Sequence, residues 1–133
     1  MIRALFGIFL VLHGVVHLLY LGQSQRVFEL QPGMVWPDGA WLSRSVGVGS
    51  LRTGASVALG VAALGFAAAG IALLAGQDWW RPVTVGAGVF SAAVYLALWD
   101  GTARRLDNQG GVGLLIDLAL VAMALLRWPD FGL

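Results

Sequence analysis

Four long apolar runs constrain the fold of this chain more than any other feature. They cover residues 4–22, 52–75, 81–99 and 111–128, and a helix needs roughly 20 apolar residues to cross a bilayer. Only helices and closed barrels satisfy the backbone hydrogen bonds in lipid, and these runs lack the two-residue alternation of barrel strands. We therefore predict an all-α integral membrane protein, a four-helix transmembrane bundle that forms one domain over residues 1–133.

The composition favours the same class. Of the 133 residues, 59% are hydrophobic and 11% are charged, and a soluble domain of this size has too little interior to bury so much apolar surface. A formal net charge of +1 gives no reason to expect a nucleic-acid partner. The absence of cysteine excludes disulfides and thiolate metal sites. The expected partner is the lipid bilayer.

The segment 23–50 is the one long connection between the runs. It contains Pro32, Pro37, Trp36 and Trp41, and its apolar and aromatic content favours a lid lying on the bundle over a flexible tether. All six tryptophans lie in this segment or at the end of a run, which indicates an aromatic belt at the lipid head groups.

The arginines predict an orientation. Four crossings place both chain ends on one side, here called the terminal side, with residues 23–50 and 100–110 on the opposite, loop side. The loop side carries five arginines (Arg26, Arg44, Arg52, Arg104 and Arg105) and the terminal side three (Arg3, Arg81 and Arg127). By the positive-inside rule we expect loops 23–50 and 100–110 in the cytoplasm of a bacterium and the chain in its inner membrane.

Three ionisable residues lie within the runs: His13, His17 and Asp117. Such groups are costly in lipid and usually face a protein interior. His17 lies five residues before the end of its run and Asp117 about six residues into its own. At a rise of about 1.5 Å per residue, both lie about 8–9 Å below the loop-side surface. We therefore expect His17 and Asp117 to be within reach of each other.

The helical periodicity extends this group into a pocket. His13, His17 and Tyr20 share one helical face, as do Thr84, Gly88, Ser91 and Tyr95. If both faces point inward, the loop-side half of the bundle holds a polar pocket covered by the lid. The predicted pocket has His13 and Ser91 as its floor, His17, Tyr95 and Asp117 as its walls, and Arg52 and Asp100 at its rim.

Three functions fit such a pocket. A carboxylate beside an imidazole can share a proton near neutrality, so the leading hypothesis is a site that binds a small apolar or amphipathic ligand or relays protons. The rival is an accessory or structural subunit of a larger membrane complex, in which the polar pair only locks helix packing. An intramembrane enzyme with His17 and Asp117 as acid and base is least favoured, because no group that would stabilise an electrophile is evident.

Metal and haem sites are only partly constrained. Two histidines four residues apart on one helix cannot ligate opposite faces of one haem, whereas a haem shared between two chains stays open. The same spacing suits a divalent metal with Asp117 as third ligand. Because this ligand set is incomplete, we assign no metal, and the cofactor stays unknown.

The first run resembles the opening helix of DoxX-like small four-helix bacterial membrane proteins. The residues that carry the resemblance are Arg3, Leu5, Gly7, Phe9, Leu10, Gly14, His17 and Leu18, whereas His13 departs from that pattern. The similarity covers about twenty residues and the number of runs. It implies an accessory or small-molecule-binding membrane protein and supplies no catalytic residue. Because small bundles often assemble, we also expect a homo-oligomer or a larger membrane complex.

Overall fold

The computed structural model describes all residues, 1–133, and is entirely helical. Its elements are α1 (Ile2–Ser24), α2 (Ser43–Val46), α3 (Val48–Leu74), α4 (Trp80–Ala97), the 3-10 helix η1 (Leu106–Gln109) and α5 (Gly111–Leu125). The all-α prediction is confirmed. The short helices α2 and η1 lie within the two loop-side connections, where the sequence predicted no helix.

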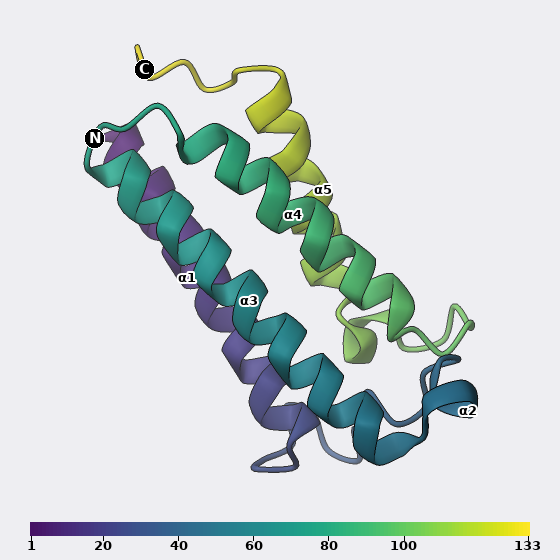
Figure 1. Cartoon of the computed structure of the whole chain (residues 1–133). Helices are drawn as coiled ribbons and strands as arrows, with labels where there is room; N and C mark the ends of the chain where they lie inside the picture. The colour runs from purple at the N-terminus through teal and green to yellow at the C-terminus, as the bar shows by residue number, and fades with distance from the viewer.

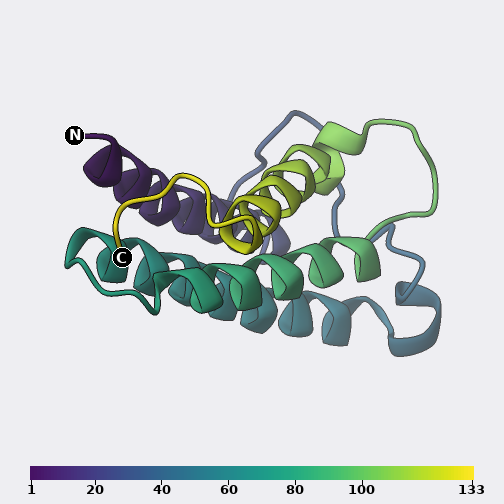
Figure 2. The same ribbon diagram turned by 90° about the horizontal axis from the view of Figure 1, so that it is seen from above.

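The four long helices run antiparallel in chain order, with each packed against the next (Figure 1). Both chain ends lie at one end of the bundle, and the segments 25–47 and 98–110 lie at the other (Figures 1 and 2). α1 and α5 do not form an extended interface with each other. They are connected instead through side chains in the interior, and these side chains form the site described below.

The helix bounds differ from the predicted runs by a few residues. α1 has 23 residues and α3 has 27, and these two helices are long and apolar enough to cross a membrane. α4 has 18 residues and α5 has 15, so α5 is about 22 Å long at about 1.5 Å per residue. α5 ends at Leu125, before the end of the predicted run at 128, and Arg127 has a left-handed φ of 54°.

Glycines bring α1 and α3 into close contact. A Cβ atom at Gly70 would lie 2.6 Å from the carbonyl oxygen of Gly7, and a Cβ at Gly14 would lie 2.8 Å from that of Ala63. Neither helix backbone can accommodate a side chain there without moving. Glycine therefore sets the separation of α1 and α3, because the two backbones lie closer together there than any side chain permits.

Replacing Gly70 by alanine is expected to lower the free energy of unfolding by about 1–3 kcal/mol, because the methyl group overlaps the backbone of α1. Gly54→Ala, on the exposed side of the same helix, is the matched control. A Cβ there meets nothing within 4 Å, so the better helix propensity of alanine leaves stability unchanged or raises it by up to about 1 kcal/mol. Denaturant titration of both variants in micelles gives the comparison, and equal stabilities would contradict the close contact.

Two apolar clusters fill the interior, one toward each end. The terminal-end core comprises Leu10, Phe66, Ala69, Ala72, Leu73, Trp80, Ala87 and Leu120. The loop-end core comprises Met34, Trp36, Ala40, Leu51, Ala55, Leu59, Tyr95 and Leu98. Trp36 and Trp80 are 4% and 0% exposed. The predicted aromatic belt is therefore wrong for these two tryptophans, because Trp36 packs on Tyr20 and Tyr95, and Trp80 packs on Phe6 and Phe131.

Candidate functional site

Four polar side chains meet in the interior between the two apolar cores. They are His13 and His17 on α1, Ser91 on α4 and Asp117 on α5, here called the buried cluster, and none is more than 3% exposed. His13 Nε2 lies 2.7 Å from Asp117 Oδ1, and Ser91 Oγ lies 2.5 Å from Asp117 Oδ2. His17 Nε2 lies 2.6 Å from Ser91 Oγ, and His17 Nδ1 lies 2.9 Å from the His13 carbonyl oxygen. One hydrogen-bonded chain thus joins three helices.

Glycine also sets the approach of α4 and α5 at this point. A Cβ at Gly88, one turn before Ser91, would lie 2.6 Å from Val121 Cγ2 and 3.3 Å from the carbonyl oxygen of Asp117. The absent side chain lets α5 come close enough for its carboxylate to reach Ser91. The sequence placed Gly88 on the same helical face as Ser91 and Tyr95, and in the structure α5 occupies the space beside it.

The hydrogen-bond pattern fixes how many protons the cluster holds. The carbonyl oxygen of His13 can only accept, so Nδ1 of His17 carries a hydrogen. Two short contacts then connect His17 Nε2, Ser91 Oγ and Asp117 Oδ2, and each contact needs one hydrogen. Ser91 supplies one hydrogen only. The second comes from a protonated His17 or from a protonated Asp117, so the three groups together hold one proton beyond neutral histidine and ionised aspartate.

The two arrangements of that proton interconvert through Ser91. In the first, a His17 imidazolium donates to Ser91, and Ser91 donates to the Asp117 carboxylate. In the second, a protonated Asp117 donates to Ser91, and Ser91 donates to neutral His17. Passing from one to the other moves one hydrogen from His17 to Ser91 and one from Ser91 to Asp117, while the net charge stays the same. Both arrangements use the same hydrogen bonds, so this geometry allows a proton to pass between His17 and Asp117 through Ser91.

The surroundings of the cluster differ on its two sides. Toward the terminal side, His13 packs against Phe9 and edge-on against Phe66, with a centroid distance of 4.6 Å to Phe66. The apolar terminal-end core lies beyond these rings. Toward the loop side, the His17 ring lies 5.8 Å from the ring of Tyr95, which lies 5.5 Å from that of Tyr20. The Tyr20 hydroxyl donates to the carbonyl oxygen of Asp107, an exposed residue of η1. Two tyrosine hydroxyls therefore lie on the loop side of the cluster, whereas the buried hydroxyl on its terminal side, that of Thr84, bonds to the carbonyl oxygen of Trp80.

The structure brings five of the seven predicted site residues together. Tyr95 packs against His17 with its ring plane tilted by 44°, and its buried hydroxyl has no hydrogen-bond partner. Asp117 contacts His13 directly and His17 only through Ser91, whereas the sequence placed His17 nearest. The depth estimate assumed that the first run ends and the fourth begins at the same level, whereas α1 extends farther toward the loop-side end than the start of α5 (Figure 1).

Arg52 and Asp100 lie apart from the cluster. Arg52 donates to Asp38 of the long loop, and Asp100 Oδ1 accepts hydrogen bonds from the backbone and the hydroxyl of Thr102. Of the predicted site residues, Asp100 and Tyr95 line the main cavities of the molecule, and no residue of the buried cluster does. The buried cluster is therefore packed within the bundle and does not line an open pocket in this conformation.

The cluster also contains the donor set that the sequence connected with a divalent metal. One ligand atom from each of His13, His17 and Asp117 lies within 4.8 Å of the others. A tetrahedral site with bonds of about 2.0–2.1 Å needs ligand atoms free of other partners, whereas His13 Nε2 and Asp117 Oδ1 already lie 2.7 Å apart as a hydrogen-bonded pair. Here they are engaged in the hydrogen-bonded chain, so the geometry fits a proton better than a metal.

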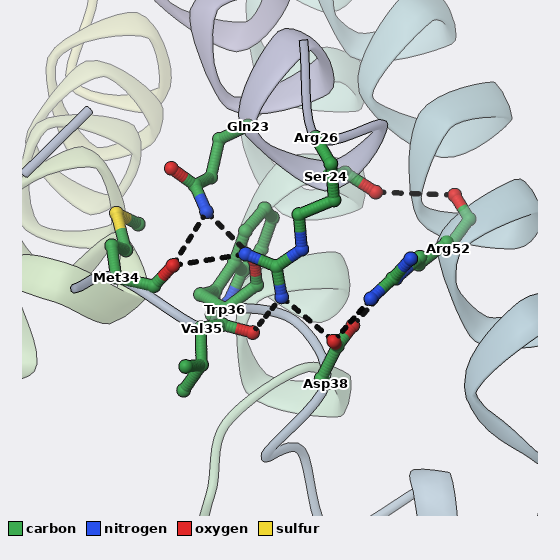
Figure 3. Close-up of polar contacts among 8 residues, drawn as sticks. All are labelled: Gln23, Ser24, Arg26, Met34, Val35, Trp36, Asp38 and Arg52. Atoms are coloured by element: carbon green, nitrogen blue, oxygen red, sulfur yellow. Dashed lines mark hydrogen bonds and ion pairs between the residues drawn. The ribbon is translucent and has the colours of Figure 1, made fainter. Parts of the chain in front are cut away.

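The long loop is pinned over the loop-side end of the bundle by polar contacts (Figure 3). The fully buried Gln23 donates to the carbonyl oxygens of Met34 and Trp36 and accepts from the backbone N–H of Leu30. Arg26 donates to the carbonyl oxygens of Met34 and Val35. These bonds hold Trp36 against the aromatic side chains that lie above His17.

Asp38 closes the loop by binding two arginines. Arg52 donates to both of its carboxylate oxygens, and Arg26 donates to Oδ2 at 2.7 Å. The hydrogen bonds from Arg52, followed by those from Arg26, hold the pKa of Asp38 below its usual value. The stabilisation is therefore present above the unfolded pKa of about 3.9, and it is lost as the pH falls through the lower folded value.

Replacing Asp38 by asparagine is expected to raise the rate of tryptic cleavage after Arg44, an exposed arginine of the same loop, about fivefold. The side chains of Arg26, Asp38 and Arg52 are partly exposed. Together their two ion pairs therefore stabilise the closed loop by about 1 kcal/mol. The wild type should become as open as the variant only after acidification below about pH 4, measured by cleavage of both proteins within the loop by a protease that is active in acid. A variant as resistant as the wild type at neutral pH would contradict the role of Asp38.

Sequence reasoning missed Gln23, Arg26 and Asp38 as positioning residues. The available signal was a polar pair, Gln23 and Ser24, placed directly after an apolar run and before a loop rich in tryptophan and proline. A buried amide at that point satisfies backbone groups of a loop folded back onto the helix.

No protein-family model, no curated protein and no solved structure matches this chain.

Proposed function

We propose that this chain is an integral membrane protein whose four long helices all cross the bilayer. Large apolar side chains point outward along each of them, and α4 and α5 lie alongside the two helices that can span a membrane (Figure 1). A bilayer that surrounds α1 and α3 therefore also surrounds α4 and α5. The outward residues include Leu5, Leu12 and Leu18 of α1, Leu64 and Ile71 of α3, Val89 and Leu96 of α4, and Leu115, Leu118 and Leu125 of α5.

Within this bundle, the buried cluster carries a proton and passes it between His17 and Asp117 through Ser91. The observation that supports this function is the chain of two short contacts from His17 Nε2 to Asp117 Oδ2, which needs one proton more than neutral histidine and ionised aspartate supply. Removing that proton would leave an uncompensated negative charge in an apolar core. The proton is therefore held until another group can take it.

Protons reach the cluster from the loop side. The hydroxyls of Tyr95 and Tyr20 lie in that direction, whereas Leu10, Phe66 and Trp80 close the terminal side. Passage of a proton to the terminal side requires the terminal-end core to open. The protein is thus a proton-coupled membrane protein with its relay at the centre of the bundle.

A second function is favoured by a different feature of the same site. The cluster joins α1 to α4 and α5, and each of its side chains has a partner, as expected of a polar lock in an accessory subunit. Ser91 separates the two functions, because its removal breaks the relay and leaves the direct bond between His13 and Asp117 intact.

Ser91→Ala is expected to lower proton uptake at least about tenfold, because the only hydrogen-bonded link between His17 and Asp117 is lost. The assay uses liposomes that contain the purified protein and a pH-sensitive dye, with an imposed pH gradient and the membrane potential clamped. Thr84→Ala is the matched control, since Thr84 is also buried on α4 and its hydroxyl bonds only to the carbonyl oxygen of Trp80.

If liposomes with the wild type took up protons no faster than protein-free liposomes, the proton relay would be wrong. The polar lock of an accessory subunit would then be the function that remains. Several expectations from the sequence stay predictions. They are the orientation with loops 23–50 and 100–110 in the cytoplasm, the location in a bacterial inner membrane, a homo-oligomer or larger complex, binding of a small hydrophobic ligand, and the DoxX-like resemblance. The relay depends on none of them.

A further inference from the structure

A cavity of about 290 Å³ lies between the two loop-side segments and has a mixed lining. Met34, Trp36 and Ala40 of the long loop and Leu98 at the end of α4 form its apolar wall. Polar and charged residues of the segment 100–109 form the rest. An apolar wall facing a charged rim suits an amphiphile better than a fully polar solute.

The charged rim is positive. Arg104 and Arg105 line the cavity, and neither guanidinium has an ion-pair or hydrogen-bond partner within the chain. The one acidic lining residue is Asp100, whose Oδ1 is occupied by the backbone and hydroxyl of Thr102. Two free arginines close together are the donors that phosphate and carboxylate groups prefer.

A second, apolar cavity of about 210 Å³ adjoins the first. Gln109 lines both, and the second is formed by side chains such as Leu96, Trp99 and Leu114, where α4 ends and α5 begins. Trp99 lies at the level where tryptophan anchors to lipid head groups. A molecule with its head in the first cavity therefore has an apolar surface beside it for a hydrocarbon chain.

We propose that these cavities bind an anionic amphiphile, with its phosphate or carboxylate head group at Arg104 and Arg105 and its hydrocarbon chain against the apolar cavity between α4 and α5. This inference uses the membrane part of the proposed function but not the proton relay. The ligand chemistry is that of an anionic phospholipid of the loop-side leaflet.

The test is native mass spectrometry of the full-length protein in a non-ionic detergent. The probes are dioctanoyl phosphatidylglycerol, the zwitterionic dioctanoyl phosphatidylcholine, and glycerol phosphate, which has the head group without the chains. The wild type should bind phosphatidylglycerol, and Arg104→Gln/Arg105→Gln should bind it at least about tenfold more weakly, since two charge-assisted contacts are lost. Arg44→Gln, which removes an exposed loop-side arginine outside the cavity, should bind like the wild type.

Three results would overturn the proposal. Equal binding of phosphatidylcholine and phosphatidylglycerol would show that the charge of the head group does not contribute to binding. Equal losses in the double variant and in Arg44→Gln would show that the attraction is not local. Glycerol phosphate binding as tightly as the lipid would assign the site to a soluble anion. Because no proton flux is measured, failure here leaves the relay unaffected, and failure of the relay leaves this site unaffected.

Discussion

Asp117→Ala is expected to lower the free energy of unfolding by about 3–5 kcal/mol, the range found when one partner of a buried charged pair is removed. The truncation leaves His13 Nε2 without a partner and Ser91 with one partner in place of two. Neither group can turn to water, because the whole cluster is buried. Loss of helical signal during titration of micelles with sodium dodecyl sulfate measures the change.

Asp117→Asn is the matched control for that variant. An asparagine has the shape of a protonated aspartate, and its amide can donate to Ser91 while Ser91 donates to His17, so every hydrogen bond of the second proton arrangement is kept. Its stability should stay within about 1 kcal/mol of the wild type. If both variants lost stability equally, the hydrogen-bond pattern described for the cluster would be wrong.

Gln23→Ala is expected to release the long loop and to raise tryptic cleavage after Arg44 about 30-fold. The substitution leaves the carbonyl oxygen of Met34 and the N–H of Leu30 short of a partner beneath a packed loop. Such lost bonds total about 2–3 kcal/mol. The increase should exceed that for Asp38→Asn, because Gln23 is fully buried and is not screened by water.

Gln25→Ala is the matched control on the same turn of chain. Gln25 is exposed and bonds to Ser56 and the carbonyl oxygen of Arg52, with no contact to the loop backbone. Its cleavage rate should match that of the wild type. If trypsin cleaved Gln23→Ala and Gln25→Ala after Arg44 at the same rate, Gln23 would not hold the loop in place.

Helix periodicity and depth predicted which polar residues meet in the interior, and why they meet. His13, His17, Ser91 and Asp117 form one cluster because each lies on the inward face of its helix and at a similar level. The pairing within the cluster was not predictable in the same way. An error of one helical turn, about 5.4 Å, decides whether His13 or His17 meets Asp117, and run ends read from composition are uncertain by that amount.

The contacts of the loop could not be predicted from composition. Arg52 was assigned to the rim of a pocket by its level alone, whereas its partner Asp38 lies in a loop whose path depends on packing of Trp36. The burial of Trp80 likewise depends on Phe131, which returns from the chain end. In both cases a tertiary contact overrides the tendency of tryptophan to lie at a lipid interface.

The proton count of the buried cluster is the central claim, and nuclear magnetic resonance of the full-length protein in lipid nanodiscs tests it most directly. The chain has only two histidines, so ¹⁵N labelling of histidine with ¹³C labelling of aspartate carboxyls gives an assignable spectrum, with Asp117→Asn identifying the Asp117 signal. At neutral pH we predict either a His17 imidazolium with an ionised Asp117, or a neutral His17 protonated at Nδ1 with a protonated Asp117. A neutral His17 together with an ionised Asp117 would contradict the account.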